Sequence, residues 1–229
     1  MNLNVKGRGS ISNKVFHSSR ARATQGSPAF QEHSSVKIEV EKTSWNSRKL
    51  FANVSVMAPL RMVWECLTDY DHLDKFIPSL VENKCLERRP QGALLKQVGA
   101  VKMGVQFSAQ CKLECSEFRN GLPEEFCSTS GDGSDGLLPH PKDSIPGVKY
   151  SDISFVQVEG DFQAFRGVWR MQPEGPRTTR LSYSLYVQPM SWLPVRLIQN
   201  RIQQEVITNL SAIKNHSEKL FSLQDKGAS

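Results

Sequence analysis

Residues 192–221 read WLPVRLIQNRIQQEVITNLSAIKNHSEKLF, and this stretch decides the fold. Apolar residues recur in it at the three- and four-residue spacing of one face of an α-helix. This apolar stripe consists of Val195, Ile198, Ile202, Val206, Leu210 and Ile213. A sheet with one apolar face has to cover that face, and a long amphipathic helix at the end of the chain is a suitable cover.

The residues before this helix supply the strands of such a sheet. In VQFSAQCKLECSEF, residues 105–118, apolar side chains alternate with polar ones, which is typical of an antiparallel sheet with one side facing water. Residues 36–56 form one strand-like region. Two short helices are predicted at 58–70 and 72–76, and further strands at 80–88, 93–103, 151–160, 162–172 and 179–189.

This order of elements predicts an α+β fold. We expect a curved antiparallel sheet of about seven strands around the long C-terminal helix. A strongly curved sheet wrapped around a single helix leaves a gap between the two layers. The gap is a natural apolar pocket for a ligand.

Residues 120–148 interrupt the strand pattern. They are rich in glycine and proline and are predicted to form a long loop, either at the mouth of the pocket or as a disordered insert. Within them SGDGSDG, residues 130–136, matches GxGxxG. A dinucleotide site needs a strand before this motif and a helix after it, and Asp132 and Asp135 would repel a phosphate. We therefore interpret the match as accidental.

Three acids and a histidine lie close together in DYDHLDKFIPSL, residues 69–80. Metal binding would require Asp69, Asp71, His72 and Asp74 to converge, but on a broken helix they point in several directions. We instead interpret the segment as a hinge in which Asp71 caps the second short helix. The five cysteines include no CxxC pair, so neither a zinc ribbon nor a disulfide framework is indicated. We nominate no metal ligand.

The net charge of +6 comes mainly from the N-terminus. Residues 1–31 contain basic residues and serines but no acid, which is typical of an organelle transit peptide, although an ordinary disordered tail is the alternative. The remaining body is nearly neutral, which argues against nucleic acid as a partner. We expect the chloroplast as the location, with the mitochondrion as the alternative.

Three motifs together resemble one known family. They are WECLTDYDHLDKFIPSL (64–80), VEGDFQAFRGVWRMQP (158–173) and the terminal helix after WLP (192–194). The chain resembles the START-related, or polyketide cyclase/dehydrase and lipid-transport, superfamily, and within it the coenzyme Q-binding START-type group in its plastid and cyanobacterial form. The resemblance covers residues 35–222 and leaves 223–229 as a tail. It implies the helix-grip fold and a cavity for a lipid or other hydrophobic ligand.

Candidate ligand-binding residues lie on the apolar faces of the predicted strands and of the terminal helix. Gln97 and Tyr183 share these faces with apolar neighbours and are candidate anchors for a polar head group, to which Arg166 is added. The full set is Leu95, Gln97, Val101, Met103, Val105, Phe107, Phe155, Phe165, Arg166, Trp169, Leu181, Tyr183, Leu185, Ile198, Ile202 and Val206.

The function expected from these features is binding or transfer of a hydrophobic ligand without covalent chemistry. An isoprenoid quinone or another prenyl-lipid is the first candidate, and no other cofactor is expected. No catalytic residue is nominated, because no GxSxG motif is present and no histidine falls on a predicted strand that faces the cavity. Two alternatives remain, namely a cyclase- or dehydratase-like enzyme using the same cavity and a protein-interaction adaptor with a filled core.

A membrane surface is a further candidate partner. Leu137 and Leu138 in the long loop, and Trp192 and Leu193 before the terminal helix, are apolar residues in otherwise polar segments. We expect them either to rest on a membrane during ligand transfer or to pack at the mouth of the cavity.

Overall fold

The computed structural model describes residues 36–103, 105–128 and 136–227, except for the side chains of residues 100–108. The predicted leader, residues 1–31, lies outside the described residues, as does most of the GxGxxG match at 130–136. The side chains of four candidate ligand-binding residues, Val101, Met103, Val105 and Phe107, also lie outside them.

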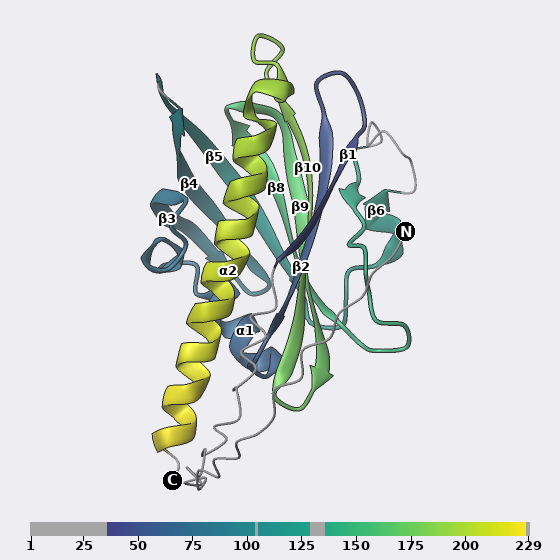
Figure 1. Ribbon diagram of the computed structural model, residues 1–229, viewed down its shortest axis with the longest axis vertical. Coiled ribbons are helices and arrows are strands. Elements are labelled where there is room, and N and C mark those ends of the chain that lie inside the picture. The colour runs from purple at the N-terminus through teal and green to yellow at the C-terminus, as the bar shows by residue number, and fades with distance from the viewer. Residues whose placement is uncertain (1–35, 104, 129–135, 228–229) are drawn as a thin grey trace, which may run out of the picture. The chain divides into compact units, whose positions relative to one another are not determined.

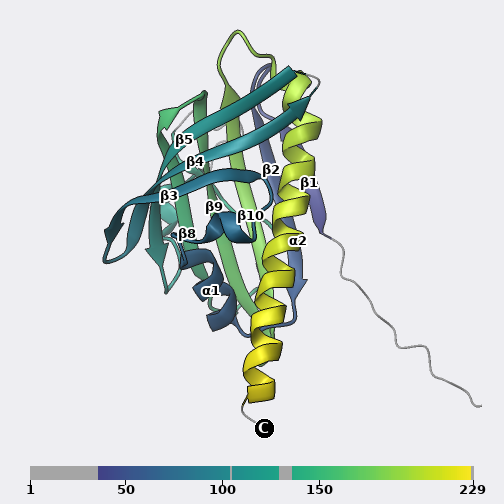
Figure 2. The same ribbon diagram turned by 90° about the vertical axis from the view of Figure 1, so that its left-hand side faces the viewer.

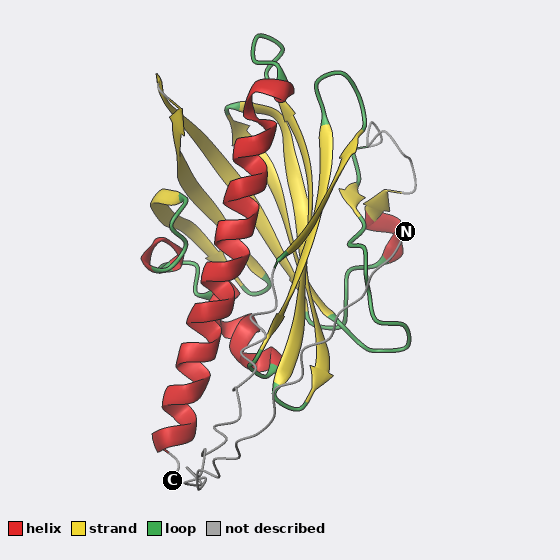
Figure 3. Ribbon diagram, viewed as in Figure 1, coloured by secondary structure: helices red, strands yellow, loops and turns green. Residues whose placement is uncertain are grey.

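Eight antiparallel strands form the main sheet, which a long helix crosses on one face (Figures 1 and 3). In spatial order the strands are β1-β2-β10-β9-β8-β5-β4-β3. Their bounds are β1 Lys37–Lys42, β2 Arg48–Val56, β3 Leu80–Arg89, β4 Gly92–Met103, β5 Val105–Phe118, β8 Ser151–Gly160, β9 Phe162–Gly175 and β10 Thr178–Pro189. The predicted α+β helix-grip fold is confirmed.

The sheet has one strand more than the predicted seven, because residues 36–56 form a hairpin rather than a single strand region. The chain turns between β1 and β2, where the Thr43 N–H donates to the Ser47 carbonyl and the Ser47 hydroxyl bonds the Ser44 hydroxyl. The polar residues TSWNS, 43–47, supply this turn. The turn leaves Trp45 exposed.

Helices α1 (Leu60–Thr68) and α2 (Val195–Gly227) and the 3₁₀ helix η1 (Leu73–Lys75) complete the inner layer. The predicted apolar stripe of α2 is confirmed, because its residues are buried or half-buried against the sheet and α1. The helix continues into the predicted tail, where Asp225 pairs with Arg177 and the Arg177 guanidinium lies over the Phe221 ring. No helix in the described part of the chain has the length and apolarity needed to span a membrane.

The sheet curves most strongly around β3, β4 and β5 (Figure 2). Register shifts interrupt the β3–β4 pairing after Leu80 and Cys85 and the β5–β8 pairing after Lys112. Such bulges bend a strand and increase its twist. At its C-terminal half α2 is held close to β2, since Lys214 donates to the Ser55 carbonyl and the Met57 N–H donates to Glu218. The helix therefore closes one side of the sheet and leaves space beside β3–β5.

The described parts of segment 120–148 lie on the outer face of the sheet, away from α2 (Figure 1). They contain the 3₁₀ helix η2 (Glu124–Phe126) and the strands β6 (Cys127–Ser128) and β7 (Leu138–Pro139), which pair in parallel. Leu122, Cys127 and Leu138 are buried against Val168 of β9. Of the two alternatives for this segment, the cavity mouth is wrong for its described parts, because they pack on Val168 at the outer face of β9.

A buried ion pair fixes the loop to the sheet. The Arg170 guanidinium donates to both oxygens of the Asp152 carboxylate at 2.9 Å, with side-chain exposures of 1% and 0%. Asp152 also accepts the Leu122 N–H, and Arg170 donates to the Ser144 hydroxyl. One charge pair thus contacts both ends of the loop.

Replacing one member of this pair is expected to destabilise the fold strongly. Arg170→Met leaves the Asp152 carboxylate buried without its counter-ion, and such changes lower the free energy of unfolding by about 3–5 kcal/mol. Urea denaturation followed by circular dichroism measures the change.

Arg61→Met is the control, because Arg61 forms an exposed pair with Glu65 on α1 and its loss is expected to cost less than about 1 kcal/mol. Equal effects of the two substitutions would contradict the structural role of the buried pair.

Candidate functional site

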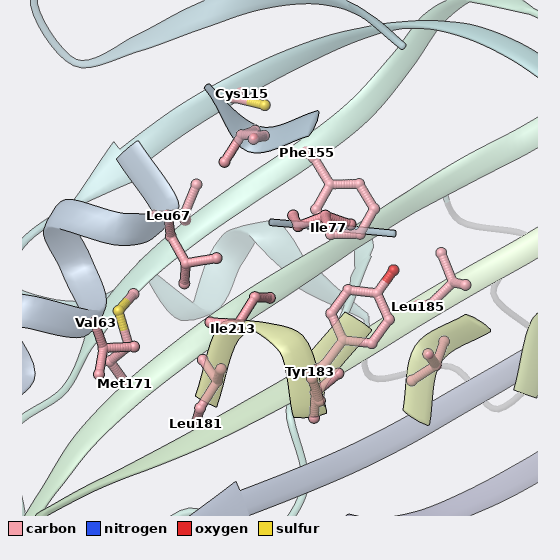
Figure 4. Packing of buried hydrophobic residues seen from close by; sticks show 14 of the residues in the cluster. Val63, Leu67, Ile77, Cys115, Phe155, Met171, Leu181, Tyr183, Leu185 and Ile213 are labelled. Carbon is pink, nitrogen blue, oxygen red and sulfur yellow. The ribbon is translucent and has the colours of Figure 1, made fainter. Parts of the chain in front are cut away.

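A cavity of about 210 Å³ lies between α2 and the inner face of the sheet. Its wall is mostly apolar and comes from the end of α1, the hinge around η1, strands β3–β5 and β8–β10, and the first half of α2. Figure 4 shows Leu67, Ile77, Phe155, Tyr183 and Leu185 projecting into the space between these elements. The cavity is the space that the curved sheet and the straight helix leave between them.

Most of the candidate residues whose side chains are described line this cavity. They are Leu95, Gln97, Phe155, Phe165, Trp169, Tyr183, Leu185, Ile198, Ile202 and Val206. Leu181 faces the same side of the sheet, but it is fully buried in the hydrophobic core and does not line the cavity.

The prediction that Arg166 faces the cavity is wrong. It lies on the outer face, where its Nε donates to the Leu137 carbonyl and its guanidinium covers the Tyr186 ring. The neighbouring Phe165 faces the cavity, so the alternation of β9 sends Arg166 to the opposite side.

An aromatic wall forms one side of the cavity. The Phe155 ring stacks on Tyr183 with centroids 5.7 Å apart, and the Trp169 ring lies 4.2 Å from Tyr183. Gly167, which pairs with Phe155 across β8 and β9, makes room for this packing. A Cβ atom at Gly167 would lie 2.5 Å from the Phe155 ring and 2.1 Å from the Ser184 carbonyl oxygen. The absent side chain is therefore what allows the ring to lie flat beside the cavity.

The hinge of residues 69–80 forms another part of the wall. Leu73 and Ile77 project into the cavity, whereas Asp69 and His72 bond each other at the surface, 2.8 Å apart. The predicted cap by Asp71 is wrong, because His72 is the residue before η1 and no side chain caps this helix. Among the described residues no group of three or more potential metal ligands converges, here or elsewhere.

Comparison with known families places these features in context. Residues 56–214 match the family described as "Polyketide cyclase / dehydrase and lipid transport". The chain belongs to this family. The match begins in β2 and ends within α2, so it includes every element that lines the cavity. No curated protein sequence matches the chain.

Several solved structures share the fold of this chain at low sequence identity. The STAR-related lipid transfer protein from Xanthomonas axonopodis (fragment 25–204) superposes with a TM-score of 0.61 at 12% identity, covering 80% of this chain and 93% of that one. Human STARD10 gives a TM-score of 0.61 at 12% identity, over 84% and 73%. The Zhui aromatase/cyclase from Streptomyces sp. R1128 gives 0.54 at 15%, over 76% and 94%.

Several lining residues of this family member were not nominated from its sequence. The largest group comes from the hinge and the neighbouring strands, and a second group comes from α2. They are Leu67, Tyr70, Leu73, Ile77, Ser79, Leu80, Gly99, Ala109, Cys111, Leu113, Cys115, Ile153, Phe162, Arg201, Glu205 and Asn209. The signal for the α2 group was present in the sequence, since Arg201, Glu205 and Asn209 each follow a residue of the apolar stripe at helical spacing.

Polar side chains near β3 and β5 are already engaged within the protein. Gln97 donates to the Asn83 side-chain oxygen at 3.0 Å, and Asn83 donates to the Tyr70 carbonyl at 2.7 Å. The Cys111 thiol donates to the Gln157 side chain. Burial raises the pKa of the Cys111 thiol to about 12, so the thiol is protonated at neutral pH and is a weak nucleophile.

The polar groups opposite them lie on α2 and β10. Glu205 accepts a hydrogen bond from Arg201 Nε at 2.9 Å, one helical turn away. Burial raises the pKa of the Glu205 carboxyl, and the Arg201 charge opposes this effect only in part. Burial also raises the pKa of the Tyr183 hydroxyl, with a smaller contribution from the charge of Glu205. Glu205 and Tyr183 are therefore two acid groups of the cavity wall whose pKa is raised by burial.

The partly buried Glu205 carboxyl predicts a specific dependence of stability on pH. Because the pKa of Glu205 is higher in the folded than in the unfolded protein, deprotonation favours the unfolded state. The Glu205 contribution to stability is therefore expected to fall as the pH rises from about 4.5 through the raised pKa, and Glu205→Gln removes it. Urea midpoints from pH 4 to 8 measure the difference.

Glu65→Gln is the matched control, because Glu65 also accepts from an arginine four residues before it at 2.9 Å but lies at the surface. It is expected to follow the wild-type profile. A Glu205→Gln profile parallel to that of the wild type would contradict the assignment.

Proposed function

We propose that this chain is a non-catalytic carrier that binds a hydrophobic ligand in the cavity between the sheet and α2. The observation that carries this proposal is the cavity itself, with its mostly apolar wall and its place inside the segment that matches the lipid-transport family. Burial of apolar ligand surface would supply the affinity, at about 0.8 kcal/mol for each buried CH₂ group. An open cavity also disfavours the adaptor alternative, which requires a filled core.

For the ligand class, we propose an isoprenoid quinone or another prenyl-lipid. The motifs at 64–80 and 158–173 support this choice, since they resemble the coenzyme Q-binding START-type group. The aromatic wall supports it independently, because Phe155, Trp169 and Tyr183 offer flat surfaces on which a ring can stack. The similar protein from Xanthomonas axonopodis is a STAR-related lipid transfer protein, which agrees with a lipid as cargo.

Filling the cavity is expected to abolish binding without unfolding the protein. Ala109 lines the cavity on β5, and Ala109→Phe places a ring in the space that a ligand would occupy. We expect at least a tenfold loss of affinity for a short-chain prenylquinone, measured by isothermal titration calorimetry.

Ala164→Phe is the control, because Ala164 precedes the cavity-lining Phe165 on β9 and faces the other side of the sheet. It is expected to bind as the wild type does. Retention of full affinity by the Ala109→Phe variant would refute binding in this cavity.

An enzymatic cyclase or dehydratase is the second candidate. The observation that favours it is the pair of acid groups in the cavity wall, the partly buried Glu205 and the buried Tyr183, which are suited to proton transfer. The fold similarity to the Streptomyces aromatase/cyclase is compatible with this alternative. Mass spectrometry of ligand recovered after binding separates the candidates, because a carrier returns its ligand unchanged and an enzyme does not.

For delivery of the ligand, we propose contact with a membrane surface through the loops next to the start of α2. Trp45 and Trp192 are 66% and 69% exposed, on loops that Asn46 ties together. The Asn46 amide donates to the Pro189 carbonyl, and its oxygen accepts the Val195 N–H. Exposed tryptophans favour the interface between lipid and water. Leu138 is excluded from this role because it is buried under the outer loop.

Removing this apolar surface is expected to weaken membrane association. The double variant Trp192→Ser/Leu197→Ser removes two exposed apolar side chains near the start of α2. We expect at least a fivefold loss in co-sedimentation with liposomes of phosphatidylcholine and phosphatidylglycerol.

Leu223→Ser is the control, since Leu223 is similarly exposed near the opposite end of α2 and is expected to have no effect. Unchanged co-sedimentation of the double variant would refute the proposed contact.

A further inference from the structure

The cavity wall carries polar side-chain atoms that make no hydrogen bond to the described residues, and they belong to Tyr70, Tyr183 and Asn209. Tyr183 is only 7% exposed, and its hydroxyl makes no hydrogen bond to the described residues. The side-chain oxygen Oδ1 of Asn209 is buried and likewise accepts no hydrogen bond from them. Buried polar atoms without partners are costly, so each calls for an explanation. Both residues line the cavity, and a bound ligand is in a position to supply the missing partner.

The α2 residues of this group lie on one strip of the helix. Arg201, Glu205 and Asn209 are spaced four residues apart and therefore lie above one another on the side that faces the cavity. Tyr183 faces the same cavity from β10, and Figure 4 shows its hydroxyl pointing into the space between Phe155 and Leu185. Tyr183 and Glu205 line the same cavity, and the Glu205 charge contributes to the raised pKa of Tyr183. We call Tyr183, Glu205 and Asn209 the polar pole of the cavity.

The balance of donors and acceptors limits what the polar pole can bind. Asn209 Oδ1 is an acceptor, an ionised Glu205 is an acceptor, and the Tyr183 hydroxyl both donates and accepts. A ligand with acceptors alone, such as a quinone, ester or ether, can engage Tyr183 but leaves the Asn209 oxygen unpaired. A hydroxyl group can accept from Tyr183 and donate to Glu205 or Asn209. At the buried oxygen Oδ1 of Asn209, the missing partner is therefore a donor.

Charge limits the ligand further. Arg201 already pairs with Glu205, so the pole carries no uncompensated negative charge that would require a cationic head group. An anionic head group would meet the Glu205 carboxylate and the electron-rich aromatic wall. A neutral head group fits both constraints.

We propose that the ligand is a neutral amphiphile with a free hydroxyl group, and that Tyr183, Glu205 and Asn209 bind this hydroxyl. The inference rests on the proposed carrier function and refines it, because among prenyl-lipids it selects prenyl alcohols and the reduced, hydroquinone form of prenylquinones. The apolar wall binds the chain of the ligand, and the polar pole fixes its orientation.

Matched ligand pairs test this assignment by calorimetric titration of the full chain. The first pair is farnesol and farnesyl methyl ether, in which a methyl group replaces the hydroxyl hydrogen of farnesol. The second pair, titrated without oxygen, is a farnesylated hydroquinone and its quinone, which distinguishes a phenolic from an aliphatic hydroxyl. We expect the hydroxylated member of at least one pair to bind about tenfold or more tightly than its partner.

Three variants assign the preference to the polar pole. Tyr183→Phe and Asn209→Leu keep the size of each side chain and are expected to reduce the preference to about twofold. Tyr186→Phe is the control, because Tyr186 lies on the same strand but on the outer face, where its hydroxyl bonds Gln188. It is expected to leave the preference unchanged.

The possible failures are distinguishable. Equal affinity for both members of each pair would overturn the hydroxyl proposal and leave the carrier function intact. A preference that survives in both Tyr183→Phe and Asn209→Leu would overturn the assignment to the polar pole. If the wild-type protein binds none of the four ligands, the hydroxyl proposal and the prenyl-lipid carrier function fail together.

Discussion

The packing of α2 on only part of the concave sheet is the constraint on which the rest of this structure depends. The apolar stripe of the helix is straight, whereas bulges after Leu80, Cys85 and Lys112 bend the sheet away from it. At the C-terminal half of α2, contacts to β2 and α1 close the core completely. At the N-terminal half, the same straight helix cannot follow β3–β5, and the cavity results. Core and cavity are therefore two outcomes of one packing arrangement.

Buried polar groups lie on both faces of the sheet. On the outer face, Arg170, Asp152 and Gln172 are buried, and each is paired with the sheet or with the loop of residues 120–148. On the inner face, the side-chain oxygen Oδ1 of Asn209 has no hydrogen-bond partner among the described residues. The unpaired Asn209 oxygen lies at the cavity, so a ligand that donates a hydrogen bond to it would supply the missing partner.

The fold was predictable because its decisive signals are periodic. The stripe from Val195 to Ile213 and the alternation along residues 105–118 each specify an element and its buried face. The apolar lining residues Phe155, Trp169 and Ile202 followed from the same patterns. Arg166 was misassigned because its facing depends on where β9 starts, which alternation alone does not fix. Glu205 and Asn209 were missed because charged and amide residues beside an apolar stripe resemble an ordinary solvated helix face. The position of the 120–148 loop depends on the tertiary pair Arg170–Asp152, which has no local sequence signature.

The cavity also gives this molecule an unusual mechanical property. Hydrostatic pressure favours whichever state of a protein has the smaller volume, and unfolding eliminates internal voids. A core that contains a space of about 210 Å³ is therefore more compressible than a filled one of the same length. A ligand that occupies the space fills this void and lowers the compressibility. The resistance of the protein to pressure thus reports the occupancy of the cavity directly.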